Sequence, residues 1–352
     1  MDDRAILLVN GLKYEGWKEV EVSRSMEAVA GSFSVSLTDS WTGLDRRWTI
    51  SQHDEVSVLL SGTPAIKGYI DAIDVSENAT SREISIRGRD KSADLVDCSV
   101  PTSPSEYKAV TLLGLAFRLA GTVGVRVLSQ GASLEVFKTW KVQPGESIFE
   151  SLERAARQRG VLLMPDGLGG VLLVKPGIIP AGGALIEGEN ILSISTSVDN
   201  SQRYSSYTVI GQSQREQGWE GSVNDVSGKA ADDGLDRERP LVIVAEGVTT
   251  NAQAKARAQW EATIRAARSL TVSVVVQGWT DAVGKLWEPN RIVTLKAPNA
   301  GASGRLLISS TVFRKGANGT TTTLELRRPD AFTPEPTVPK KGSDKQPVGW
   351  KF

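Results

Sequence analysis

Few residues in this chain have the type and spacing that catalysis or metal binding requires. His53 is the only histidine among 352 residues, which removes metal sites built on several histidines and most two-histidine mechanisms. It stands in a Ser-Gln-His-Asp turn, where a solvated side chain is more common than a catalytic base. Cys98 is the only cysteine, so no intramolecular disulfide can form, and without a CxxC partner we interpret it as an inert thiol.

Two further patterns are better explained by structure than by chemistry. The run from Gly167 to Gly170 lacks the Gly-Lys-Ser/Thr ending of a phosphate-binding loop and leads into a strand pattern, which favours a hairpin loop. Asp232, Asp233 and Asp236 miss the spacing of an EF-hand loop, so we interpret them as solvated carboxylates. Acidic residues are plentiful, but no pair is singled out for glycoside hydrolysis. We therefore predict no enzyme, no cofactor and no metal site.

Composition narrows the function classes further. The 41 Lys and Arg residues balance 41 Asp and Glu residues, which argues against a high-affinity binder of nucleic acid or anionic membranes. The Met-Asp-Asp-Arg start has no apolar signal region, and no run approaches the roughly 20 apolar residues of a membrane-spanning segment. We expect synthesis in a reducing host cytoplasm. The length predicts two or three domains.

Residues 1–98 are predicted to form a first antiparallel β-barrel domain. Asn10-Gly11 is a strong hairpin signal, and residues 33–37 alternate Phe, Val and Leu with serines, as in a half-buried strand. No window here has helical periodicity. About six or seven short strands with regular turns indicate a small antiparallel barrel or sandwich.

A small α/β domain is predicted over residues 99–185. Ser147 and Glu150 have the spacing of a capping box, and apolar residues of the following turns fall on one helical face. The stretch that starts at Trp140, W-K-V-Q-P-G-E-S-I-F-E-S-L, resembles the opening of a LysM peptidoglycan-binding module. A LysM module continues with a second helix, whereas two strands are predicted here. A LysM-like structural insert is favoured, and glycan binding stays an alternative.

The remaining chain is predicted to hold a second antiparallel β-barrel domain, formed by residues 186–211 and 269–330. Residues 212–268 between them are predicted to be a polar surface loop and a long Ala-rich helix, which begins at residue 251. The tail, residues 331–352, is rich in Pro and Lys and is predicted to be flexible. The fold class is thus mainly β with an α+β insert.

One segment, residues 278–295, is predicted to organise the second barrel domain. It carries two bulky indoles beside Gly and Pro-Asn turns, and such indoles usually plug the open end of a β-layer and are buried there. The segment has no nucleophile, base or metal ligand, so its role is structural. The motif residues are Gly278, Trp279, Gly284, Leu286, Trp287, Pro289 and Asn290.

An internal similarity relates residues 54–90 to residues 290–330. Both stretches contain a strand, a Gly turn, a second strand, a polar loop, an alternating strand and an Arg shortly before an Asp. Chance similarity among β-rich segments is common, so both coincidence and a true duplication stay open. A duplication would give two related β-domains with the α/β domain and the helix inserted between them.

Four motifs in order along the chain resemble those of the baseplate hub proteins of Mu-like contractile-tailed phages. They are D-K-S-A-D-L-V-D-C-S from Asp90 to Ser99, the helix P-G-E-S-I-F-E-S-L-E-R-A-A-R, A-R-A-Q-W-E around Trp260, and the G-W…G-x-L-W-x-P-N segment. The resemblance extends over nearly the whole chain up to about Asp330. That family is similar to other contractile-tail hubs and to the N-terminal part of VgrG spike proteins.

The resemblance implies a structural virion protein of the tail baseplate, with two β-barrel domains per chain and a homotrimer whose six barrels form a ring. It implies that the ring joins the tail tube to the central spike, contacts other baseplate proteins, and lets DNA pass through a channel without specific binding. A peptidoglycan-binding tail protein and a tail-associated cell-wall hydrolase remain the alternative functions.

Overall fold

The computed structural model describes residues 4–39, 50–78, 82–130, 134–177, 179–212 and 226–335. The chain divides into two compact units. Unit 1 comprises residues 4–203 and Ile264–Pro334, and unit 2 contains Tyr204–Thr263 together with Glu335. The chain therefore leaves unit 1 after Arg203, returns to it within a helix at Ile264, and leaves it again after Pro334.

The first part of unit 1 is a set of antiparallel strands. They are β1 (Ala5–Val9), β2 (Leu12–Tyr14), β3 (Glu19–Ser25), β4 (Ser32–Asp39), β5 (Glu55–Leu60), β6 (Thr63–Glu77) and β7 (Arg82–Asp90). Asn10 and Gly11 join β1 to β2 with φ values of 50° and 80°, which the tight two-residue hairpin turn requires at both positions. Every second side chain of β5 is buried, so the period-2 pattern places one face of the strand on the core.

An α/β domain follows directly after β7 and has its own apolar core. Its elements are η1 (Lys91–Ala93), α1 (Asp94–Asp97), β8 (Glu106–Thr111), α2 (Leu112–Ala120), η2 (Gly121–Val123), β9 (Arg126–Gln130), β10 (Val136–Lys141), α3 (Ile148–Arg157), β11 (Leu162–Pro165) and β12 (Gly170–Val174). The predicted capping box at the start of α3 is confirmed, with Glu150 N donating to Ser147 Oγ at 3.1 Å and Ser147 N donating to the Glu150 carboxylate at 2.7 Å.

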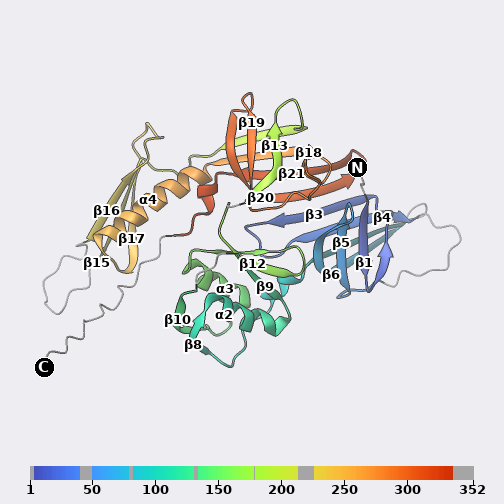
Figure 1. The fold of residues 1–352 in the computed structure, drawn as a ribbon, viewed down its shortest axis with the longest axis horizontal. Helices are drawn as coiled ribbons and strands as arrows, with labels where there is room; N and C mark the ends of the chain where they lie inside the picture. The colour runs from blue at the N-terminus through green and yellow to red at the C-terminus, as the bar shows by residue number, and fades with distance from the viewer. Residues whose placement is uncertain are drawn as a thin grey trace, which may run out of the picture. The chain divides into compact units, whose positions relative to one another are not determined.

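The last part of unit 1 returns to the large sheet. Its elements are β13 (Ile179–Ile186), β14 (Ser193–Val198), β18 (Leu270–Gln277), β19 (Arg291–Ala297), β20 (Ala302–Gly316), β21 (Gly319–Arg327) and η3 (Pro329–Phe332). The sheet order is β14-β18-β21-β20-β3-β4-β7-β6-β5-β1-β2, with β19 also on β20 and β13 parallel to β19. Figure 1 shows β3, in blue, beside the orange-red β20. The two ends of the chain thus share one sheet.

The prediction of two closed antiparallel barrels needs correction. Among the described residues no closed barrel is found, because β14 and β2 end the main path of one 13-stranded sheet. The pairing is also not purely antiparallel, since β13 runs parallel to β19. Alternation of apolar residues reports which face of a strand is buried, but it does not report whether the first and last strands of a sheet meet. The coarser prediction of a mainly β chain with an α+β insert is confirmed.

The two halves of this sheet repeat one pairing pattern. Strands β5-β6-β7 and β19-β20-β21 are consecutive antiparallel meanders, and the middle strand has 15 residues in both. The register shifts at Ile70 to Ala72 in β6 and at Ile308 to Ser310 in β20. Beyond each meander the order continues as β7-β4-β3 and as β21-β18-β14. The internal similarity seen in the sequence therefore corresponds to a repeat of structure.

Unit 2 is a small three-stranded sheet covered by a helix. It contains β15 (Ser206–Gln212), β16 (Val226–Ala231) and β17 (Pro240–Val248), in the order β16-β15-β17, and most of α4 (Asn251–Arg268). Tyr207, Val209 and Val226 pack with Ala254 and Ala258 of the helix. The helix backbone approaches the sheet closely at Gly228, where an added Cβ would lie 2.0 Å from Lys255 N, so this position of β16 requires glycine.

Two predictions for residues 212–268 differ from the structure. The predicted polar loop, residues 212–239, contains β16, whose pairing with β15 overrides a Gly-containing sequence with little alternation, and the apolar residues that follow it form β17. The predicted long Ala-rich helix is α4, which has 18 residues and so falls within the ordinary range of about 8–20 residues in globular proteins. Residues 213–225 of the predicted loop and residues 336–352 of the predicted flexible tail lie outside the described residues. No helix in the described parts has the length and apolarity to cross a membrane.

Candidate functional site

The C-terminal half of β20 joins the two halves of the sheet. Residues 310–315 pair with β3, so Phe313 lies opposite Val22 and Arg314 lies opposite Glu21. Phe313 and Val22 are both 0% exposed, and Arg314 Nε donates to the Glu21 carboxylate at 2.9 Å. We call this pairing of β3 with β20 the seam. It combines backbone pairing, a buried apolar contact and an ion pair.

The predicted tryptophan segment packs beside the seam. Trp279 is buried, and its Nε1 donates to the carbonyl oxygen of Arg314 at 3.2 Å. Gly278 precedes it with a φ of 75°, its N–H donates to Thr320 O at 2.9 Å, and its carbonyl accepts from Thr322 Oγ1 at 2.6 Å. The Trp279 indole thus bonds to β20 and the backbone of Gly278 to β21, so the segment is tied to both strands of this hairpin.

The rest of the motif forms a short loop closed by Asp281. The Asp281 carboxylate accepts from the backbone N–H of Val283 and of Lys285, both at 3.0 Å. Gly284 takes a φ of 80° within the loop. Leu286 forms an isolated bridge with Thr280 and is buried, as is Trp287. This loop places the indoles of Trp279 and Trp287 in the apolar core of the large sheet.

Asn290, the last of the motif residues, connects the segment to the chain before β13. Its φ is 64°, its side-chain oxygen accepts from Gly177 N at 2.7 Å, and its side-chain nitrogen donates to Lys175 O at 3.3 Å. Pro289, beside it, lines a surface pocket of about 190 Å³ together with Arg24. The motif residues are thus brought together by the fold as packing and turn residues.

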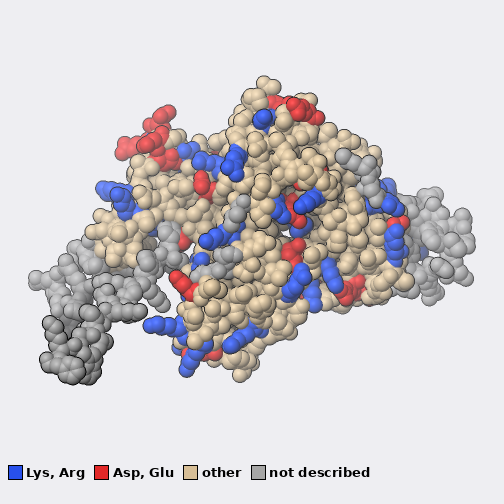
Figure 2. All heavy atoms as spheres, viewed as in Figure 1, with Lys and Arg blue, Asp and Glu red and all other residues tan. Residues whose placement is uncertain are grey.

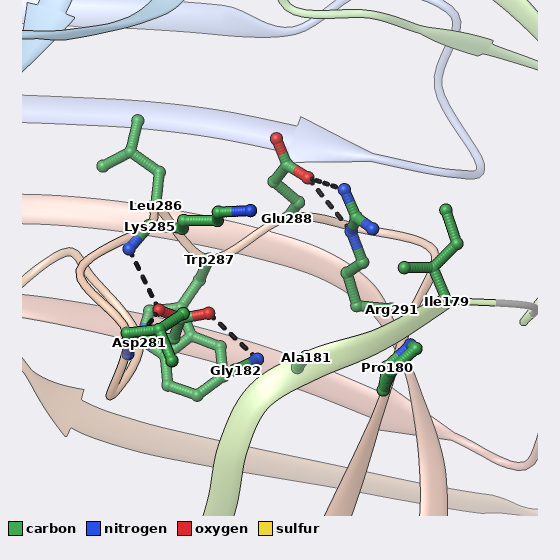
Figure 3. A pocket seen from close by; sticks show the side chains of 11 residues that line it. Ile179, Pro180, Ala181, Gly182, Asp281, Lys285, Leu286, Trp287, Glu288 and Arg291 are labelled. Atoms are coloured by element: carbon green, nitrogen blue, oxygen red, sulfur yellow. Dashed lines mark hydrogen bonds and ion pairs between the residues drawn. The ribbon is translucent and has the colours of Figure 1, made fainter.

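A second pocket, of about 300 Å³, lies between this loop and β13 (Figure 3). Asp281 bridges the two walls, because its second oxygen accepts from Gly182 N at 3.0 Å. Glu288 and Arg291 form an ion pair at 2.5 Å on the same rim. Every acidic side chain in this pocket thus has a basic or backbone partner, and the arrangement serves to fix β13 in place.

A buried charged cluster links β3 to the α/β domain. Arg24 is buried, and its guanidinium donates to the carbonyl oxygen of Asp166 at 3.3 Å. Burial lowers the pKa of Arg24, and the carboxylates of Glu288, Asp90 and Asp166 act in the opposite direction. Sequence reasoning missed this cluster because its members are far apart in the chain and form no local motif.

Asp90, the last residue of β7, is the other buried charge of this region. Its Oδ1 accepts from Ser92 N at 3.0 Å and from Ser92 Oγ at 2.7 Å, while Oδ2 has no hydrogen-bond partner. Burial raises the pKa of Asp90, and the hydrogen bonds from Ser92 oppose that shift. Ser92 Oγ also lies 2.6 Å from Val29 O, so its single O–H is shared between that carbonyl and the Asp90 carboxylate. The cluster therefore caps η1 and positions the start of the α/β domain.

The residues first considered for chemistry lie apart from one another. His53 is exposed in a turn with a φ of 68°, and Cys98 is half-buried at the end of α1. The run from Gly167 to Gly170 is the hairpin loop between β11 and β12, where Asp166 Oδ1 accepts from Leu168 N at 2.7 Å and Gly170 N at 2.8 Å. In the described parts of the chain, no group of acidic, His and Cys residues could hold a metal ion.

The LysM-like stretch presents its aromatic residue to the protein core. Trp140 is buried on β10, and its Nε1 donates to Ser151 Oγ of α3 at 3.2 Å. Its ring stacks against the Arg154 guanidinium at 4.2 Å and lies 5.0 Å from the Phe137 ring. A sugar could not stack on this indole without unfolding the site, so the geometry does not favour glycan binding.

Charges on the surface are mixed in sign. Figure 2 shows lysine and arginine side chains interspersed with aspartate and glutamate over the face drawn. Many of them pair, as Arg87 does with Asp74 and Arg89 with Asp71, both at 2.8 Å. Such a surface suits contact with other proteins better than tight binding of a polyanion.

Family models cover most of the chain in consecutive segments. Residues 5–90 match "Mu phage baseplate assembly protein GpP-like, N-terminal", and residues 92–175 match "Baseplate hub protein gp44-like, second domain". Residues 203–260 match "Tail protein NMB1110-like, third domain", and residues 250–335 match "Mu phage baseplate assembly protein GpP, fourth domain". The class is therefore that of phage tail baseplate proteins.

The full-length comparison defines the family within this class. The chain is 34% identical to the baseplate hub protein gp44 of Escherichia phage Mu over 343 residues, which is 94% of this chain and 89% of that protein. The chain belongs to this family of baseplate hub proteins.

Solved structures show the same fold. The 43 kDa tail protein of prophage MuSo2 from Shewanella oneidensis has a TM-score of 0.85 and 30% identity, over 95% of this chain and all of that one. The Francisella PdpA–VgrG complex has a TM-score of 0.60 and 9% identity, over 96% of this chain and 59% of that one, which is a likeness of fold alone. The resemblance to baseplate hubs and VgrG spikes stated from the sequence is thus confirmed.

Proposed function

We propose that the protein is a homotrimeric ring in the baseplate of a contractile phage tail, acting without catalytic turnover. The observation that carries this is the repeated sheet. One chain already places two halves of the same strand order side by side across the seam, so three chains supply six similar units. A ring of six similar units has the symmetry needed to continue a tail tube built of sixfold rings.

The ring would join the tail tube on one side to the central spike on the other, with other baseplate proteins around it. The name of one fold relative, a PdpA–VgrG complex, supports an assembly that includes a spike protein. The central channel would let DNA pass without specific binding, and the balanced charge of the chain supports this because strong phosphate binding would oppose ejection. The motif residues of the tryptophan segment, which range from Gly278 to Asn290, would act as structural residues of the second half of the sheet.

Light scattering of the purified protein tests this function. At micromolar concentration we expect a mass three times that of the 37.8 kDa chain, and negative-stain images should show rings with a central hole. A chain that stays monomeric at high concentration would contradict the proposal. Cosedimentation with peptidoglycan and zymography on cell walls should be negative, and a positive result in either would favour one of the alternative functions.

A further inference from the structure

Unit 2 exposes an apolar face of its small sheet. Along β17, Leu241 and Ile243 pack against the core that α4 covers. Val242 and Val244 alternate with them and therefore point to the opposite face of the sheet. Their side chains are 60% and 67% exposed. Ile210 of the central strand β15 is half-buried and shares this face, since Val209 beside it packs under the helix.

Strand β17 also has an open edge. It is the last strand in the order β16-β15-β17 and pairs in parallel with β15 on one side. In the described parts of the chain, no strand pairs with its other side. The centre of the strand, L-V-I-V-A, carries no charged side chain that would protect such an edge. An added strand could therefore use both the backbone groups and the two exposed valines.

A segment of this same chain has the pattern of such a strand. Residues 336–352 lie outside the described residues, and their sequence ends in P-V-G-W-K-F. Val348, Trp350 and Phe352 alternate with a glycine and a lysine, which is the period-2 pattern of a strand with one apolar face. Pro347 directly precedes them, and proline is tolerated at the first position of an edge strand.

The described chain brings this segment within reach of β17. Glu335 forms an ion pair with Arg257 of α4, and α4 begins at Asn251, three residues after the end of β17. The chain from Glu335 to Val348 can span about 45 Å when fully extended. Strand β17 has nine residues and is thus about 30 Å long. Every part of its open edge is accessible, and the tether raises the effective concentration of the segment there.

Opposite charges favour one direction for the added strand. Residues 336–352 contain four lysines and one aspartate, and three of these lysines precede the alternating segment. The turn before β17, residues 232–239, contains four acidic residues and two arginines. Asp233, Asp236 and Glu238 of this turn are exposed. With the lysines beside the turn, the alternating segment would run in the same direction as β17.

We propose that residues 348–352 of this chain add a fourth strand to the sheet of unit 2, parallel to β17, with Trp350 packed on Val242 and Val244. Addition of a strand to a sheet edge obtains affinity from backbone hydrogen bonds and specificity from alternate side chains. The indole contributes the largest apolar area of the segment. The contact forms within one chain, so it does not depend on the proposed ring.

Hydrogen exchange of the full-length protein tests the pairing from the side of β17. The β17 amides that do not donate to β15 should be protected in the parent. Trp350→Ala should make them exchange at least tenfold faster, while the amides of β15 stay unchanged. Lys351→Ala is the matched control, because its side chain would point to the other face, and it should leave the exchange of β17 within about twofold of the parent.

The reverse experiment reads the same contact from the segment. Val244→Lys should speed exchange of the amides of residues 348–352 at least tenfold, because a charged side chain replaces the apolar surface under Trp350. The valine is 67% exposed, so unit 2 should stay folded, and unchanged exchange in α4 checks this. Val283→Lys, at a valine that is 65% exposed outside unit 2, is the control and should leave the segment unchanged.

Disulfide trapping identifies which chain supplies the strand. In a Cys98→Ser background, Trp350→Cys is combined with Val242→Cys or with Val244→Cys, since neighbouring strand residues on one face approach the Cα separation of a disulfide. Mild oxidation should remove the free thiols of at least one protein while its band stays at the monomer position on a non-reducing denaturing gel. The control pairs Val244→Cys with Lys351→Cys and should oxidise at least fivefold more slowly.

Each result decides for or against the added strand. Equal exchange of β17 in the parent and in Trp350→Ala would overturn it, as would equal effects of Val244→Lys and Val283→Lys on the segment. Oxidation of both Trp350→Cys proteins no faster than the control would also overturn it. Bands at twice the chain mass, lost on dilution, would show that a second copy supplies the strand and would overturn the contact within one chain.

Discussion

Phe313 of β20 lies directly opposite Val22 of β3, and neither side chain is exposed to solvent. The pair connects a strand near the start of the chain with one near its end. Contacts of such high sequence separation are entropically costly to form. Burial of these two apolar side chains, together with the adjacent backbone pairing, is what offsets that cost at the seam.

Replacing Phe313 with Ala is therefore expected to destabilise unit 1 strongly. Truncation of a buried phenylalanine costs about 3–5 kcal/mol in the free energy of unfolding. Val75→Ala, at an exposed position of β6, should change the free energy of unfolding by no more than about 0.5 kcal/mol. Urea denaturation at low protein concentration measures both. Equal losses for the two variants would contradict the assignment of the seam as a buried joint.

Trp279 offers a test of the tryptophan segment. Trp279→Ala should lower the free energy of unfolding by about 3–5 kcal/mol, because a buried ring is removed. Trp279→Phe keeps most of the apolar contact but loses the hydrogen bond to Arg314 O, so a smaller loss is expected. Thermal melts of both variants give the comparison. If Trp279→Ala melted within a degree of the parent, the structural role of the segment would be refuted.

Asp90 predicts a pH-dependent stability difference. Because burial raises its pKa in the folded state, the folded protein binds the proton more tightly than the unfolded chain. Stability from this group therefore falls as pH rises from the ordinary aspartate value of about 3.9 through the raised folded pKa. Asp90→Asn removes this titration, so its stability relative to the parent should increase with pH across that window. Urea denaturation from acid to neutral pH measures the difference, and a pH-independent difference would show that Asp90 does not titrate abnormally.

The capping box of α3 predicts a modest and local effect. Ser147→Ala should cost about 1 kcal/mol, since one backbone N–H at the helix start loses its acceptor. Ser227→Ala, at an exposed serine of β16, is the control and should be close to neutral. Denaturant midpoints with unchanged slopes give the values. A Ser147→Ala protein as stable as its control would mean that solvent replaces the cap without loss.

The local elements were largely predictable from the sequence because their signals are local. The Asn10-Gly11 turn, the capping box at Ser147 and the alternation of Phe33 to Leu37 each correspond to the structure expected. The hairpin at Gly167 was also predictable, because Asp-Gly turns have a specific backbone requirement. These features depend on residues a few positions apart.

The long-range arrangement was not predictable in the same way. The seam joins two strands that each alternate well, and alternation carries no information about which partner a strand selects. Strand β13 lies in a segment rich in Gly and Pro, and such a composition does not predict a strand. Its pairing with β19 is interrupted by a bulge between Pro180 and Ala184. The cluster of Arg24, Asp90 and Asp166 was missed because only the fold brings these residues together.

The seam has a consequence for the energetics of assembly. A ring of six separate units would need five associations to bring its members together, and each would cost translational and rotational entropy. In the proposed trimeric ring, half of the joints would lie within single chains, as the seam does, so three chains would need only two such associations. Covalent linkage also raises the effective concentration of the joined halves. In the proposed ring, the repeated sheet would thus replace half of the concentration-dependent associations by folding of single chains, which would lower the subunit concentration at which the ring closes.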